Sequence, residues 1–117
     1  MGMNNIEYAA TLRGIVYAYS EFGNFIKAIE YGNEALNVHK DILGIMHPMY
    51  ATSLNNLAYN YNEIGYCEKA IELNKLALDI REKTLGKTHP HYATSLSNLA
   101  TNYSGIGDYA KAIEFCK

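Results

Sequence analysis

Apolar side chains recur along this chain at the spacing of a helix face. The segment from Leu54 to Tyr61 carries them at i, i+3, i+4 and i+7, and the segment from Ala70 to Ile80 repeats that spacing after Gly65 interrupts it. The side chains of both stripes should be buried. No segment shows the alternation of a strand. The pattern predicts an all-α chain with helices over residues 6–22, 25–43, 48–64, 67–85, 90–106 and 109–117.

Glycine, histidine and proline mark the helix boundaries. Gly86 follows a predicted helix, which is where glycine commonly ends one. Pro48 and Pro90 open the next helices, at a position where no backbone N–H is needed. His47 and His89 precede these prolines, so each side chain can cap the helix that follows.

The whole pattern repeats with a period of 42 residues. Between residues 50–75 and residues 92–117, 17 of the 26 aligned pairs are identical, which is far beyond coincidence. Such a period is typical of arrays in which helical hairpins stack on their neighbours. We therefore expect one array without a second domain, divided into units 1–46, 47–88 and 89–117.

Two strings of residues recur within these units. Asn-Leu-Ala-x-Asn-Tyr-x-x-Ile-Gly occurs at 56–65 and 98–107, and Lys-Ala-Ile-Glu follows at 69–72 and 111–114. These strings resemble the tetratricopeptide repeat (TPR) family, in particular the 42-residue type found in kinesin light chains. The resemblance covers essentially the whole chain. It implies a right-handed solenoid of antiparallel helix pairs, about two and three-quarter repeats long.

The second helix of each unit departs from the family pattern. Gly32, Asn74 and Cys116 stand where the family usually has a large aromatic or Leu, so we expect looser packing between units there. The last unit stops at Lys117 partway along its second helix, which indicates a piece of a longer or engineered array. Apolar side chains near this end should be uncovered and promote self-association: Ala112, Ile113, Phe115 and Cys116.

Charge and composition narrow the classes of partner. The 117 residues are 49% hydrophobic and 19% charged, and ten basic residues face twelve acidic ones without forming a basic run. We therefore expect no nucleic-acid partner and no membrane partner. The first basic residue is Arg13, so the charged start of a secretory signal is missing. We expect a cytoplasmic protein in which Cys67 and Cys116 are reduced.

Candidate chemical motifs fail on their spacing. Residues 86–88 read Gly-Lys-Thr, but a phosphate-binding loop needs glycine where Arg81 stands, and a strand before it. His89, His91 and His47 lack the cysteine or carboxylate ligands that would complete a metal site. No serine has a histidine and a third orienting group. We expect no enzymatic activity, no cofactor and no metal.

Asparagine is frequent in the first helix of the second and third repeat units, although it costs about 0.7 kcal/mol relative to alanine in a helix. The TPR resemblance implies that these helices line a concave groove, and that Asn56 and Asn98 hydrogen-bond the backbone of an extended peptide. The resemblance implies the following peptide-binding residues: Arg13, Tyr17, Thr52, Asn55, Asn56, Tyr59, Asn62, Thr94, Asn98 and Thr101.

Two interpretations of the asparagines remain open. Asn56 and Asn98 either contact a ligand or solubilise an exposed helix face. Asn60 and Asn102 fall on the apolar stripe, so we assign them to the structure. The clamp with which some TPR proteins grip acidic tails needs a lysine and an asparagine on one helix, then an asparagine and further basic residues on the following units. The positions would be Arg13, Tyr17, Asn56, Thr94 and Asn98, and only Arg13 and Asn56 are compatible, which disfavours that partner class. The sequence predicts an interaction module for a peptide or protein of unknown identity; the alternative is a structural or engineered segment without a ligand.

Overall fold

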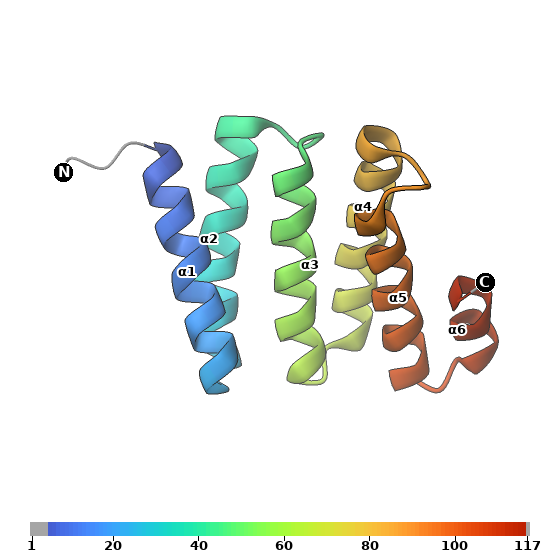
Figure 1. The fold of residues 1–117 in the computed structure, drawn as a ribbon. Helices are drawn as coiled ribbons and strands as arrows, with labels where there is room; N and C mark the ends of the chain where they lie inside the picture. Colours follow the sequence, from blue (N-terminus) through green and yellow to red (C-terminus); the bar gives the residue numbers. More distant parts are fainter. Residues whose placement is uncertain (1–4, 117) are drawn as a thin grey trace.

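The computed structural model describes residues 5–116, which form helices joined by short turns and, within this range, no strand (Figure 1). Each boundary lies within one residue of its prediction, because the apolar spacing and the glycine and proline positions agree. The helices are α1 (Asn5–Phe22), α2 (Phe25–Leu43), α3 (Pro48–Glu63), α4 (Cys67–Leu85), α5 (Pro90–Gly105) and α6 (Tyr109–Cys116).

Consecutive helices run antiparallel and stand side by side in a row, with α1 and α6 at its two ends (Figure 1). Each helix packs mainly on its neighbours in the chain, which is the contact pattern of a repeat array. The first helices of the hairpins, α1, α3 and α5, lie on one side of the row, and α2 and α4 lie on the other. The all-α solenoid predicted from the repeat is confirmed.

Each hairpin turns at a glycine that adopts a positive φ. Gly23, Gly65 and Gly107 have φ of 91°, 92° and 84°, a region that residues with a Cβ rarely enter. The helices after the longer turns begin with the predicted caps. Nδ1 of His47 and of His89 accepts a hydrogen bond from the backbone N–H two residues on, at 3.0 Å in both cases.

The main core lies between α3 and α4. Leu54 and Leu57 are 1% exposed, and Ala70 and Ala77 are fully buried where the two helices meet. The prediction that Tyr61 is buried was wrong. Its ring is half-buried, because it packs at the edge of this core and stacks on the exposed Tyr66, with ring centroids 6.1 Å apart.

The prediction of looser packing in the second helices was wrong at both positions whose side-chain surroundings the structure describes. Leu57 Cδ1 lies 3.0 Å from the point where a Cβ on Gly32 would stand, so the glycine permits a close approach. Asn74 is 3% exposed and donates from Nδ2 to Oδ1 of Asn102 on α5, at 2.6 Å. The third position, Cys116, has a side chain outside the described set.

The apolar end at α6 is better covered than its sequence predicts. Ala112 is 5% exposed, and Phe115 is half-buried and stacks on Tyr103 with ring centroids 5.5 Å apart. Among the described side chains of the four predicted, only Ile113 is exposed, because Ala112 and Phe115 pack against Leu99 and Tyr103 of α5. Self-association through this end stays a prediction.

Candidate functional site

The residues predicted to bind a peptide lie on α1, α3 and α5, on the side of the row that we call the first-helix face. None of their side chains is buried. Tyr17 and Tyr59 are 68% and 53% exposed, so both rings are open to a ligand on this face. Tyr59 also packs edge-on against Phe25 of α2, with ring centroids 6.3 Å apart.

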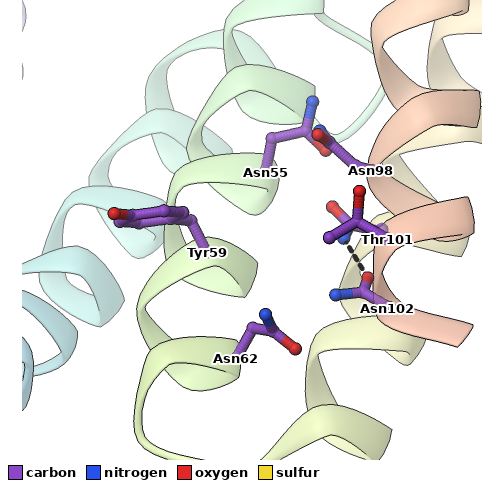
Figure 2. A pocket seen from close by; sticks show the side chains of 7 residues that line it. Asn55, Tyr59, Asn62, Asn98, Thr101 and Asn102 are labelled. Carbon is purple, nitrogen blue, oxygen red and sulfur yellow. Dashed lines mark hydrogen bonds between the residues drawn. The ribbon is translucent and has the colours of Figure 1, made fainter. Parts of the chain in front are cut away.

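A polar pocket of about 90 Å³ lies between α3 and α5. Asparagines dominate its lining, and Figure 2 shows the side chains of α3 facing those of α5 across it. Oδ1 of Asn62 is buried there without a hydrogen-bond donor in the described part of the chain. This pocket brings together five of the predicted residues: Asn55, Tyr59, Asn62, Asn98 and Thr101.

A second pocket, of about 170 Å³, lies between α1 and α3. Tyr17, Asn56 and Tyr59 line it together with Ser20 and Glu21. Tyr59 therefore stands between the two pockets and contributes to both. The first-helix face thus carries two adjoining hollows, one for each junction between neighbouring first helices.

The remaining predicted residues, Arg13, Thr52 and Thr94, do not line these two hollows. Arg13 meets Asn56 at a separate space of about 10 Å³ beside α2, which is too small for a ligand group. The hydroxyl groups of Thr52 and Thr94 donate to the carbonyl oxygens four residues back, at 3.2 Å and 3.1 Å. Both threonines are therefore engaged by their own helices.

Arg81 of α4 is a buried cation that sequence reasoning missed. It is 4% exposed, and burial lowers the pKa of its guanidinium below the usual range. Nη1 donates to His91 O and to Ser95 Oγ, both at 3.0 Å, and Nη2 donates to Thr52 Oγ1 at 3.3 Å. The ion pairs within the described residues all involve lysine, so Arg81 has no carboxylate partner there and donates its hydrogen bonds to neutral oxygens.

Arg81 also sets the orientation of a chain of amides beside the polar pocket. With its amide oxygen turned to the guanidinium, Asn55 accepts from both Nη atoms, and its nitrogen donates to Asn74 Oδ1 at 2.8 Å. Asn74 in turn donates to Asn102, as the dashed line in Figure 2 marks. Asn55 is therefore held inward, and its amide is occupied by neighbours.

The Arg81 cluster, as we call Arg81 with its partners Thr52, Asn55, His91 and Ser95, leaves a signal in the sequence at equivalent positions of the repeat. Ser95 stands on the buried stripe of α5, four residues before Leu99, and is 0% exposed. Ser53 is its equivalent on α3 and is 7% exposed. A serine on a buried stripe requires a polar partner, and the partner comes from the preceding second helix.

In the first unit that partner is His39, which stands 42 residues before Arg81. Its Nδ1 lies 2.6 Å from Ser53 Oγ. Burial lowers the pKa of this imidazole, and the nearby Arg13 and His47 lower it further. The neutral ring is therefore favoured in the fold.

Asn60 and Asn102 serve the structure, as their place on the apolar stripe predicts. Asn60 is 1% exposed, accepts from Ser20 Oγ at 2.7 Å and donates to the Asn56 carbonyl at 3.0 Å. Asn102 is 4% exposed and accepts from Asn74. Both amides join neighbouring elements of the array inside the core.

Two other features bear on the function of residues 5–116, namely metal-binding clusters and membrane-spanning helices. Within this range no group of three or more His, Cys, Asp or Glu side chains could hold a metal ion. The described helices include none that is long and apolar enough to cross a membrane.

Comparison with known proteins agrees with the fold. A solved protein of nearly identical TPR-like repeats from Podosopora anserina, described as of the kinesin light chain kind, is 28% identical with a TM-score of 0.82; the match covers 92% of this chain and 51% of that one. BtubC (BKLC) from P. vanneervenii is 24% identical with a TM-score of 0.85 and shows the fold alone, over 93% of this chain and 44% of that one.

The chain thus spans about half the length of these solved relatives. No curated protein matches it. The family model described as Tetratricopeptide repeat matches residues 7–83 and again residues 67–116, which together take in nearly all the described helices. With this match and the observed row of antiparallel hairpins, the chain belongs to the tetratricopeptide repeat family.

Proposed function

We propose that the chain is an interaction module whose first-helix face is the concave groove implied by the TPR resemblance and binds an extended segment of a protein partner. Tetratricopeptide repeats are in general protein–protein interaction modules on non-catalytic scaffolds. The observation that carries the proposal is the pair of adjoining hollows that share Tyr59. A segment lying across both would contact three successive first helices.

The asparagines supply the chemistry for holding a peptide backbone. Asn56 is exposed and Asn98 is half-buried, and within residues 5–116 neither side chain makes a hydrogen bond. An asparagine amide offers one acceptor and two donors, so it can pair with both groups of a peptide unit. These groups support backbone recognition that does not depend on the sequence of the partner.

The proposal includes an organisation of the chain into one array. Its units are residues 1–46, 47–88 and 89–117, and each unit supplies one helix to the first-helix face. Tyr17 and Tyr59 add broad contact area with few rotatable bonds, which is a property of residues that anchor interfaces. No step of this proposal is catalytic or requires a cofactor.

The test is a peptide-array screen followed by titration of variants. The Asn56→Ala/Asn98→Ala double variant should bind a selected peptide roughly five- to a hundredfold more weakly, since each hydrogen bond contributes about 0.5–1.5 kcal/mol. Its stability should stay the same or rise, because alanine is the better helix former. Asn37→Ala, on an exposed position of α2, is the matched control and should leave the affinity unchanged.

Two results would contradict the proposal. Unchanged affinity in the double variant, for a peptide that NMR places on the first-helix face, would leave Asn56 and Asn98 as solvated surface. A screen that enriches no peptide reproducibly would favour the alternative of a structural segment without its own ligand.

A further inference from the structure

A pocket of a different character opens at the α1 end of the row. Its volume is about 230 Å³, and residues of α1, the end of α2 and the start of α3 line it. Most of the lining is apolar, and Arg13, His39 and His47 add polar atoms. Ala10 and Arg13 are exposed, so the pocket reaches the surface beside the first-helix face. The apolar walls are formed by Ala9, Ala10, Ile42, Leu43 and Met49.

The repeat register explains why this space is open. A shift of 42 residues carries four of its lining residues onto the Arg81 cluster of the next unit. The equivalent pairs are Ala10 and Thr52, Arg13 and Asn55, His39 and Arg81, and Met49 and His91.

In the second unit the guanidinium of Arg81 fills the corresponding position and bonds to α3 and α5. In the first unit His39 is shorter and turns its Nδ1 to Ser53. The polar acceptors Thr52 and Asn55 have no counterparts, because Ala10 and Arg13 stand there. The first unit therefore keeps the space but lacks the side chain that occupies it in the second.

We infer that this pocket receives one apolar side chain of the bound segment, of the size of leucine, methionine or phenylalanine. The inference rests on the proposed function and adds a specificity position to it. An apolar cavity of about 150 Å³ holds a benzene ring, so about 230 Å³ accommodates one such side chain. We expect a single side chain in this pocket because, in the second unit, the single side chain of Arg81 occupies the equivalent space.

The charges around the pocket argue against other side chains. Arg13, His39 and His47 line it, and its lining includes no carboxylate among the residues that the structure describes, so a lysine or arginine would meet basic groups there. A carboxylate could reach Arg13 at the rim, but it would lose hydration against the apolar walls without a buried cation to pair with. An apolar side chain is the occupant that both walls and charges allow.

The pocket can be tested without a known partner by using capped amino acids as probes. N-acetyl-leucine amide and N-acetyl-phenylalanine amide should produce saturable NMR shifts at the Met49 methyl group and the His39 ring. The lysine and glutamate amides should not. Equal shifts from the charged amides, or no saturable shift from the apolar ones, would overturn the inference.

Two variants fill the pocket by different routes. The Ala10→Thr/Arg13→Asn/His39→Arg variant copies the arrangement that the second unit already folds around. Ala10→Leu places an aliphatic side chain at the rim instead. Both should abolish the shifts caused by the apolar probes. Ala110→Leu, the same exchange at an exposed position of α6, is the control.

For a peptide selected by screening, Ala10→Leu should weaken binding about 10- to 100-fold, which corresponds to burial of one apolar side chain. The two proposals fail separately. Apolar probes that bind while no peptide does would reject the proposed function alone. A peptide that needs Asn56 and Asn98 but binds Ala10→Leu with unchanged affinity would reject the pocket inference alone.

Discussion

The buried amide pair between α4 and α5 yields a quantitative prediction. Asn74 and Asn102 are 3% and 4% exposed, and their side chains share a hydrogen bond of 2.6 Å. Replacing either by alanine removes the bond and also leaves the other amide buried without that partner. A stranded buried group costs about 1–3 kcal/mol beyond the net value of the bond.

Each single variant should therefore lower the free energy of unfolding by about 2–4 kcal/mol. The Asn74→Ala/Asn102→Ala double variant strands no partner within this pair, so its loss should be smaller than the sum of the single losses. We expect a coupling free energy of about 1–3 kcal/mol. This magnitude separates a structural hydrogen bond from two independent polar surface residues.

The assay is urea unfolding of the four proteins, followed by far-UV circular dichroism under identical conditions. The midpoints and slopes give the free energies that enter the double-mutant cycle. Asn37→Ala, an exposed asparagine of α2, controls for the change in helix propensity and should not destabilise. If the single losses add within about 0.3 kcal/mol, the proposed dependence of one amide on the other is refuted.

Three further measurements test the packing, the electrostatics and the turns. Ala70→Leu should destabilise by about 1–3 kcal/mol through overpacking at a fully buried helix contact, and an unchanged melting temperature would contradict the assigned core. The folded pKa of His39 is lowered from 6.5 chiefly by burial, so the unfolded chain binds more protons and stability should fall as the pH drops below about 6.5. His39→Asn should show a shallower loss in pH-dependent urea melts. Gly65→Ala should cost about 1–2 kcal/mol because φ is 92° there, whereas Gly14→Ala, in open space within α1, should gain about 0.5–1 kcal/mol in the same melts.

The helices of this protein were predictable because local signals agree along the chain. Apolar spacing, a turn glycine and a proline after a capping histidine mark the middle unit, and the repeat transfers these marks to its neighbours. The residues assigned to the candidate site on α1, α3 and α5 came from the tetratricopeptide resemblance, and none of them is buried in the structure. Asn60 and Asn102 were assignable to the interior from their place on the apolar stripe.

The interior polar contacts depend on which helices meet, and a period along one helix does not contain that information. Arg81 carries no local mark of burial, yet it lies between α3 and α5 and bonds to both. Asn74 interrupts an apolar stripe and would weaken packing, except that Asn102 of the next unit meets it. The pocket beside His39 is lined by residues of α1, α2 and α3, which only the folded chain brings together. Helix periodicity thus determined the elements and their exposed faces, whereas the hydrogen bonds and hollows between units were decided only when residues distant in the chain came together.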